Sequence, residues 1–309
     1  MGTPEFAVHS LNALLVAGFD IAAVVTVPDR QSGRGLKPTP SAVKEYALQH
    51  RLPLLQPDKL RDPAFISSLQ RIDADLFVVV AFRMLPQVVW SMPRLGTFNL
   101  HASLLPQYRG AAPINWAIID GEKDTGVTTF LLNERIDEGM LLMQESTPIA
   151  PDDNAGTLHD RLAVMGADLV VRTADALFSG TITPRQQARE LNLRPAPKIF
   201  KPDCAIRWER HGQEIHDLVR GLSPYPAATA SFTDHAGKTI GMKIFNTEFI
   251  PSDDDHQLGT IFSDQKKRFE IAVKGGIIRI LSLQVNGKKK ISVDEFLRGY
   301  NVSDWKLQI

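Results

Sequence analysis

The strongest constraint on the fold is a set of apolar runs that alternate with helical segments over the first two thirds of the chain. The runs "DIAAVVTV" (20–27) and "ADLFVVVA" (74–81) are continuous and rich in β-branched residues. Runs of this kind are typical of parallel strands that are buried on both faces. Segments at 41–50, 62–71 and 156–178 have helical character. This alternation predicts a doubly wound parallel sheet of the α/β class.

Shorter runs add further predicted strands, and the long helix has a predicted cap. Thr157 follows Gly156, and its hydroxyl can accept a backbone N–H at a helix start, so we expect it to cap the helix at 156–178. The additional strands are "LPLLQ" (52–56), "GTFNLH" (96–101), "GVTTFLLN" (126–133) and "MLLMQESTPI" (140–149).

The beginning of the chain lacks one expected element. "GTPEFA" (2–7) and the amphipathic segment after it read as the loop and helix of a first βα unit, and no strand stands before them. Without that strand, its neighbours in the sheet would lose backbone hydrogen-bond partners. We therefore expect that the first strand is missing from this chain and that the natural protein begins several residues upstream with a short apolar strand.

The final third of the chain has a different texture. Residues 181–205 are proline-rich with little periodicity, which is typical of a linker. Beyond a helical segment at 211–222, short alternating runs separated by glycine or polar turns predict a small β-barrel. These runs are "AATASFTD", "TIGMKIFN", "LGTIFS", "RFEIAVKG" and "GIIRILSLQ". We expect a first domain at 1–180, a linker at 181–205 and a C-terminal barrel at 206–309.

Composition narrows the class of protein. Lys plus Arg and Asp plus Glu each total 35, so no net charge steers the chain toward nucleic acid or a membrane. The single cysteine, Cys204, cannot form an internal disulfide and excludes a Cys-rich zinc site, which fits a reducing cytoplasm. No apolar run is long enough to span a membrane, and no signal-peptide pattern opens the chain. These features predict a cytoplasmic protein.

Polar side chains at two predicted strand ends suggest a site. Asn99 and His101 lie two residues apart, so they share one face at the C-terminal end of a strand, where open α/β sheets bind ligands. Asp137 lies in a turn between two apolar strands, and Gly139 allows that turn. An amide donor, an imidazole and a carboxylate can stabilise an oxyanion and manage protons in acyl transfer. Because no serine or cysteine is placed as a nucleophile, we expect direct attack by a substrate amine.

These motifs resemble those of the formyltransferase family that uses 10-formyltetrahydrofolate. The resemblance is carried by Asn99-x-His101-x-Ser103-Leu104-Leu105-Pro106, Tyr108-Arg109-Gly110 and Asp137-Glu138-Gly139. It covers nearly the whole chain. Three further segments are similar to those of family members that formylate methionyl initiator tRNA: "GTPEFA" (2–7), "PDRQSGRG" (28–35) and "RGAAPINWAIIDGEKDTGVT" (109–128).

The resemblance implies a fold and a set of site residues. The fold is a Rossmann-like doubly wound domain followed by an OB-like β-barrel that binds tRNA. Asn99, His101 and Asp137 are the implied catalytic trio, 10-formyltetrahydrofolate is the formyl donor, and no metal is required. The protein is expected to be a monomer. The loop "AFRMLP" (81–86) is one residue shorter and more basic than the commoner form. The implied folate-binding residues are Ser103, Leu104, Leu105, Pro106, Phe82, Arg83, Met84 and Leu85.

Two basic segments are candidates for tRNA contacts. The loop at 27–40 is implied to enter the acceptor stem with Arg34, supported by phosphate contacts from Arg30 and Lys37. Lys288, Lys289 and Lys290 lie together on a predicted turn of the barrel and would add a salt-sensitive contact. Both segments are also compatible with an ordinary solvated surface.

Four other functions remain open at this level. A relative that formylates the amine of a sugar nucleotide should lack the "PDRxxGRG" insertion, which is present here, and a purine-pathway transformylase should be a shorter single domain. A hydrolase that passes the formyl group to water would share the catalytic trio. A tRNA-binding module with an inactive site is disfavoured by the intact trio.

Overall fold

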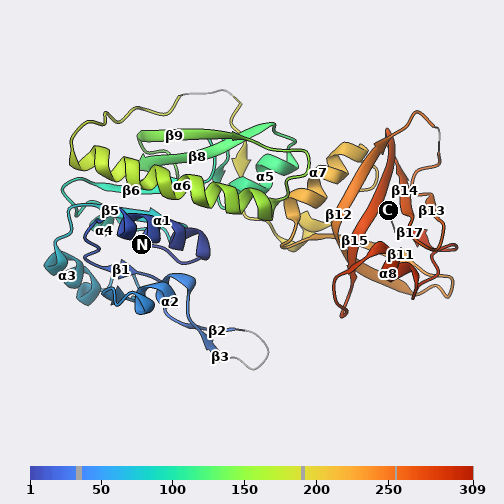
Figure 1. The fold of residues 1–309 in the computed structure, drawn as a ribbon, viewed down its shortest axis with the longest axis horizontal. Coiled ribbons are helices and arrows are strands. Elements are labelled where there is room, and N and C mark those ends of the chain that lie inside the picture. The colour runs from blue at the N-terminus through green and yellow to red at the C-terminus, as the bar shows by residue number, and fades with distance from the viewer. Residues whose placement is uncertain (33–36, 189–191, 255, 309) are drawn as a thin grey trace. The chain divides into compact units, whose positions relative to one another are not determined.

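The computed structural model describes residues 1–32, 37–188, 192–254 and 256–308 (Figure 1). The chain divides into two compact units that are each discontinuous in sequence. Unit 1 comprises Met1–Gly110, Asp124–Thr147 and His159–Ala196. Unit 2 comprises Ala111–Lys123, Pro148–Leu158 and Pro197–Ile309.

Unit 1 is built on the strands that the apolar runs predicted. A four-stranded sheet has the order β5-β6-β8-β9, and a separate parallel pair is formed by β1 and β4. β5 and β6 are parallel, whereas β8 runs antiparallel to β6, so this sheet is mixed in direction. The strands are β1 (Val24–Val25), β4 (Leu54–Leu55), β5 (Phe77–Val80), β6 (Thr97–His101), β8 (Asp124–Leu131) and β9 (Leu141–Pro148).

The first two residues lie between β1 and β5. The N–H of Gly2 donates to the carbonyl of Val25 at 3.0 Å, and the N–H of Val80 donates to the carbonyl of Met1 at 2.9 Å. The amino group of Met1 donates to the carbonyl of Val78 at 2.7 Å. Met1 and Gly2 thereby link the parallel pair β1-β4 to the four-stranded sheet through backbone hydrogen bonds.

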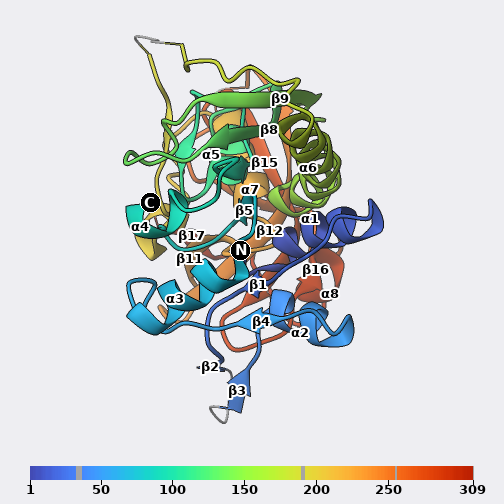
Figure 2. The same cartoon turned by 90° about the vertical axis from the view of Figure 1, so that its left-hand side faces the viewer.

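Helices cover both faces of the unit 1 sheet (Figure 2). On one face, Phe77 and Val79 pack in a buried cluster with Phe65 and Leu69 of α3 and with Val89 of α4. The opposite face carries α1 and α6, as Figures 1 and 2 agree. The helices of this unit are α1 (Glu5–Val16), α2 (Ala42–Gln49), α3 (Pro63–Ile72), α4 (Gln87–Trp90) and most of α6 (Ala155–Phe178).

The contact between α6 and the sheet depends on a small residue. A Cβ atom at Gly166 would come within 2.6 Å of Leu100 Cδ2, so glycine allows the helix to approach β6 closely. The hydroxyls of Thr129 on β8 and Thr173 on α6 lie 2.8 Å apart and satisfy each other where both are buried. The helix covers the face of the sheet to which Leu100 points, and Asn99 and His101 point to the other face.

The predicted cap of α6 is wrong. The side-chain oxygen of Asn154 accepts the N–H groups of Gly156 and Thr157, at 2.8 and 3.1 Å. Thr157 already lies in the first turn of the helix, and its hydroxyl donates to Asp153 Oδ1 at 3.0 Å. Asparagine is among the best N-cap residues, and here it stands three residues earlier than the threonine that the sequence suggested.

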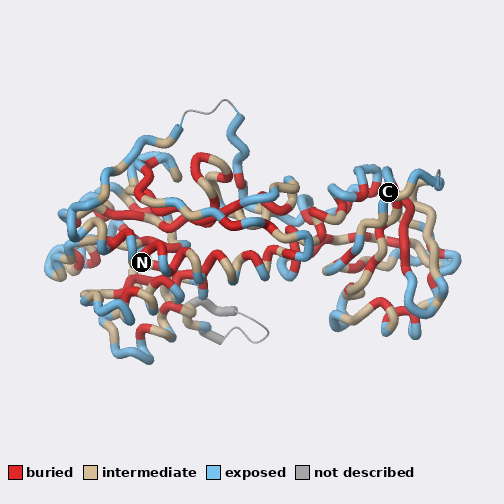
Figure 3. The backbone as a smooth tube through the Cα atoms, turned by 45° about the horizontal axis from the view of Figure 1, so that its top comes forward, coloured by how far each residue is buried: buried red, intermediate tan, exposed pale blue. Residues whose placement is uncertain are grey.

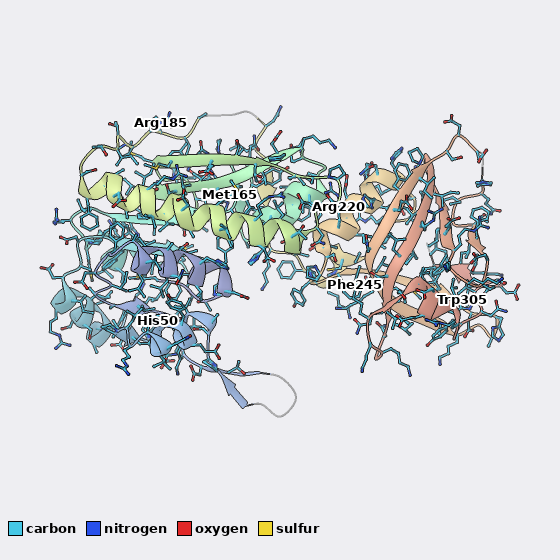
Figure 4. All side chains as sticks on the ribbon, in the orientation of Figure 1. His50, Met165, Arg185, Arg220, Phe245 and Trp305 are labelled. Carbon is cyan, nitrogen blue, oxygen red and sulfur yellow. The ribbon has the colours of Figure 1, made fainter. Side chains whose placement is uncertain are left out.

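The segment after α6 returns along unit 1. Arg185, labelled in Figure 4, exchanges two backbone hydrogen bonds with Leu141 of β9, at 2.7 and 2.9 Å. Further on, β10 (Pro195–Ala196) pairs in parallel with β7 (Arg109–Gly110). The N–H of Tyr108 also donates to the carbonyl of Arg194 at 2.7 Å. The first part of the predicted linker is therefore hydrogen-bonded to the strands and loops of unit 1.

Unit 2 contains the predicted barrel. Its antiparallel strands follow the order β13-β14-β15-β12-β11-β17, with β16 beside β15. All five predicted runs are strands, and within the described residues β16 and β17 are short additions. The strands are β11 (Ala228–Thr233), β12 (Thr239–Pro251), β13 (Ile261–Ser263), β14 (Phe269–Val273), β15 (Gly276–Val285), β16 (Ile291–Ser292) and β17 (Lys306–Leu307).

The barrel interior is aromatic and apolar. Phe232, Phe269 and Phe296 are fully buried, and Trp305, labelled in Figure 4, packs against Phe296 with ring centroids 5.8 Å apart. Figure 3 shows buried residues along the central strands and exposed residues at the turns. Cys204 is buried beside this core, and burial raises the pKa of its thiol, as expected for an unreactive structural cysteine.

Unit 2 also contains helices, and one of them comes from the first half of the sequence. α5 (Pro113–Ile119) packs on α7 (Gly212–Leu222), and α8 (Val293–Leu297) follows β16. The side chain of Asn115 donates to the carbonyl of Gly221 at 2.7 Å. A Cβ atom at Gly221 would come within 2.6 Å of Ile119 Cγ1, so the two helices meet closely.

Candidate active site

His101 ends β6 and is almost completely buried, with 6% of its surface exposed. Its Nε2 atom lies 2.8 Å from the carbonyl oxygen of Tyr108. A carbonyl oxygen only accepts hydrogen bonds, so Nε2 carries the hydrogen and donates it. Nδ1 is therefore the ring nitrogen that remains for exchange of a proton.

Asp137 lies beside that second nitrogen. Its Oδ2 atom is 3.8 Å from His101 Nδ1, which is an ion-pair distance and longer than a direct hydrogen bond. The same oxygen accepts the N–H of Gly110 at 3.0 Å. The carboxylate is thus held by a backbone donor while it faces the imidazole, and it can stabilise a positive charge on the ring.

The turn that carries Asp137 has an unusual backbone. Asp137 has a φ of 54°, in the left-handed region that most residues avoid. A Cβ atom at Gly139 would lie 1.6 Å from the carbonyl oxygen of Leu131, so no other residue fits there. The predicted need for glycine at 139 is confirmed, but its cause is a close approach to the end of β8.

Asn99 lies two residues before His101 and is half-buried. It pairs with Val79 of β5 on one side and with Phe130 of β8 on the other. Asn99 is therefore on a central strand, and its side chain projects from the same face of the sheet as the side chain of His101. The structure brings Asn99, His101 and Asp137 to one edge of unit 1.

The loop from Ser103 to Pro106 follows directly and is fixed by two side chains of neighbouring strands. The hydroxyl of Thr128 donates to the carbonyl of Ser103 at 2.6 Å and accepts the N–H of Leu105 at 3.2 Å. Gln144 donates to the carbonyl of Leu105 at 2.8 Å. Of the implied folate-binding residues here, Ser103, Leu105 and Pro106 are buried and Leu104 is half-buried.

The loop at 81–86 begins at the end of β5. Arg83 donates to the carbonyls of Pro57 and Asp58 at 2.8 and 2.9 Å, so its guanidinium binds a neighbouring loop. Phe82 and Leu85 belong to the apolar cluster under α3 and α4. Met84 is different, because 71% of its surface is exposed. Among the four implied folate contacts in this loop, Met84 is the most exposed.

The structure describes the candidate tRNA residues only in part. Arg34 lies outside the described residues. The backbones of Arg30 and Lys37 begin the antiparallel strands β2 (Arg30–Ser32) and β3 (Lys37–Thr39). In unit 2, Lys288, Lys289 and Lys290 are exposed on the turn between β15 and β16.

An aromatic partner of this lysine turn was not predicted. Lys290 Nζ lies 4.6 Å from the centroid of the Phe245 ring, which is a cation–π contact. Phe245, labelled in Figure 4, is half-buried on β12. Its neighbours along that strand, Met242 and Ile244, are buried in the core, and this pattern could have placed Phe245 on the outer face.

Within the parts of the chain that the structure describes, neither a metal site nor a membrane-spanning helix is found. No group of three or more His, Cys, Asp or Glu side chains there could hold a metal ion. Over the same residues, no helix has both the length and the apolar character needed to cross a membrane.

Comparison with known proteins shows which protein family the chain resembles. The sequence model described as "Formyl transferase" matches residues 1–174, and "Formyl transferase, C-terminal domain" matches 198–301. A methionyl-tRNA formyltransferase of Bacteroides thetaiotaomicron is 51% identical over 307 residues, which cover 98% of this chain and 95% of that protein. One of Flavobacterium johnsoniae is 47% identical over 304 residues, covering 98% and 96%.

Solved structures agree on the fold. The N-formyltransferase of Helicobacter canadensis, in complex with folinic acid and dTDP-3-aminofucose, has a TM-score of 0.65 at 18% identity and covers 94% of this chain and 97% of its own. The predicted pairing of a Rossmann-like α/β domain with a C-terminal β-barrel is confirmed. The chain belongs to the formyl transferase family and is a formyltransferase with both of the family's domains.

Proposed function

We propose that the protein transfers the formyl group of 10-formyltetrahydrofolate to the α-amino group of methionyl initiator tRNA, for translation initiation. The formyl donor is that of the family. The acceptor is supported by the names of relatives that share about half of their residues with this chain over nearly its whole length. The observation that carries the chemistry is the buried imidazole of His101 beside Asp137 at the C-terminal end of β6.

The proposed reaction is direct attack by the methionyl amine on the formyl carbon. As the new C–N bond forms, the formyl oxygen becomes negative and accepts hydrogen bonds from the Asn99 amide and from Nδ1–H of protonated His101. Donors of this kind each stabilise a transition state by about 3–4 kcal/mol. Asp137 supports the charged imidazole and takes up the amine proton through a water. The bond from carbon to folate N10 then breaks, and N10 receives a proton.

The remaining site residues extend the proposal. Ser103 to Pro106 and Phe82 to Leu85 line the folate site, and Met84 supplies exposed apolar surface. Arg30, Arg34 and Lys37 contact the tRNA acceptor stem, and the lysines at 288–290 contact its backbone. The catalytic domain spans 1–180, the linker 181–205, and the tRNA-binding barrel 206–309. The enzyme acts as a monomer in the cytoplasm.

The test is a formyl-transfer assay with two candidate acceptors and one reaction without an added acceptor. The purified chain and 10-formyltetrahydrofolate are incubated with methionyl initiator tRNA, with a dTDP-amino sugar, or with buffer alone. We expect N-formylmethionyl-tRNA in the first reaction. In the third reaction, the formyl donor should be lost no faster than in a control without enzyme. Transfer to the sugar amine, or release of formate alone, would contradict the proposed acceptor.

A further inference from the structure

Gln187 holds the turn that carries Asp137. It lies 50 residues beyond Asp137 in sequence, on the segment that returns along unit 1. Its side-chain Nε2 donates to the carbonyl of Asp137 at 2.7 Å and to the carbonyl of Gly139 at 2.9 Å. One amide group thus binds the backbone on both sides of Glu138.

The orientation of this amide is fixed by Arg109. The guanidinium donates from Nε and Nη2 to Gln187 Oε1, at 3.2 and 2.6 Å. The opposite assignment of oxygen and nitrogen would set two donors against the guanidinium and an acceptor against two carbonyls. Nη1 of the same arginine lies 3.3 Å from Glu138 Oε1, so Arg109 contacts both Gln187 and the turn.

The turn has a specific need for such support. Asp137 is in the left-handed region, a conformation that persists only when surrounding groups stabilise it. Glu134, Arg135 and Ile136, which lead into it, are exposed. The side chain of Asp137 is held by the N–H of Gly110, next to Arg109 in β7. Together, Arg109, Gly110 and Gln187 therefore hold the carboxylate of Asp137 in place relative to His101.

We infer that Gln187 is a positioning residue for the formyl transfer, acting through Asp137. This inference rests on the proposed function, because it assigns Asp137 a part in the transition state. Gln187 binds the backbone of the turn, so its effect on the reacting atoms is transmitted through Asp137. It sets the distance between Asp137 Oδ2 and His101 Nδ1. A displacement of about 1 Å in a catalytic group costs as much as 10²-fold in rate.

The test compares Gln187→Ala and Gln187→Glu with Gln186→Ala as a matched control. Gln186 is exposed on the same segment. Gln187→Glu retains the acceptor for Arg109 and loses the donor to both carbonyls. We expect both Gln187 variants to lower kcat by about 10–10²-fold, with wild-type KM for folate and tRNA, wild-type melting temperature, and no effect of Gln186→Ala. Wild-type kcat in both Gln187 variants would overturn the inference.

A double-mutant cycle provides the readout that a merely structural role would not move. If Gln187 acts through Asp137, the variant combining Gln187→Ala with Asp137→Asn has the kcat of Asp137→Asn alone. Additive losses would overturn the inference. If Gln187→Ala does not fold, Gln187→Glu replaces it in the same cycle. If the wild-type enzyme is inactive, the proposed function is refuted. If the wild type is active and the Gln187 variants are equally active, only the role of Gln187 is refuted.

Discussion

Nε2 of His101 donates to the carbonyl oxygen of Tyr108, and this single hydrogen bond decides which ring nitrogen faces the chemistry. Tyr108 itself has a φ of 58°, so its carbonyl is directed to the imidazole by a left-handed residue. Nδ1 is left opposite Asp137 Oδ2. In the proposed reaction, Nδ1–H is therefore the ring donor that is available to the formyl oxygen, while Asp137 takes up the amine proton.

Removal of the imidazole or of the carboxylate should abolish turnover without loss of folate binding. We expect His101→Ala and Asp137→Ala each to lower kcat by about 10²–10⁴-fold, because both groups act on charge that develops only in the transition state. Single-turnover kinetics with methionyl initiator tRNA would measure the loss, and fluorescence titration would measure folate affinity. Near-wild-type kcat in either variant would remove that residue from the mechanism.

The basic hairpin should act on tRNA alone. We expect Arg34→Ala to raise KM for methionyl initiator tRNA and to lower kcat, because the arginine is proposed to contact the acceptor stem. The melting temperature and KM for the folate should stay at wild-type values. Steady-state kinetics with each substrate varied in turn would distinguish these effects. An unchanged kcat/KM for the tRNA would make this loop an ordinary surface hairpin.

The lysine turn of the barrel should contribute a salt-dependent part of RNA affinity. Each phosphate contact accounts for about 0.7–0.9 in the slope of log affinity against log salt. Replacement of Lys288, Lys289 and Lys290 by alanine should reduce that slope by about 2, as measured by filter binding over a salt series. Lys274→Ala, on another exposed turn of unit 2, is the matched control. Identical slopes for the triple variant and wild type would exclude the contact.

Unit 2 should lose stability in mild acid through His216. This histidine on α7 lies 3.0 Å from the hydroxyl of Thr247, and burial lowers its pKa below the usual 6.5. The unfolded chain therefore binds this proton more readily than the folded chain does. The stability that neutral His216 contributes is present above pH 6.5 and is lost as the pH falls through its folded pKa.

The measurement is the melting temperature of wild type and His216→Gln between about pH 8 and pH 5, a range that spans the histidine pKa. We expect a smaller decrease with falling pH in the variant. His235→Gln, in an exposed turn, is the control and should follow wild type. If His216→Gln and wild type decline in parallel, another group is responsible.

The local sequence pattern was sufficient to predict the strands and the polar residues at their C-terminal ends, because each of these signals lies within a few residues. Phe77 to Val80 form a buried strand for the reason that their β-branched run suggested. The run at 20–27 forms only the two-residue strand Val24–Val25, which pairs with Leu54–Leu55. Strand length depends on pairing between segments distant in sequence, which a single run does not reveal.

The support of the site could not be read in the same way. Gln187 lies in a segment without periodicity, and its partner Arg109 is 78 residues away. No local rule relates a glutamine in a linker to the carbonyls of a distant turn. The reason why position 139 requires glycine could not be predicted either, because the clash that glycine avoids there is with Leu131, at the end of β8.

The assembly of unit 2 from three stretches of chain bears on how this protein can be divided or recombined. α5, from the first half of the sequence, supplies Asn115 to the end of α7, and Arg220 of α7 donates to the carbonyl of Asp153 at 3.2 Å. A graft that joins residues 197–309 to a foreign protein would leave those partners behind. The barrel is consequently not a portable module, and exchange of domains between relatives at a single junction would separate it from α5 and from the carbonyl of Asp153.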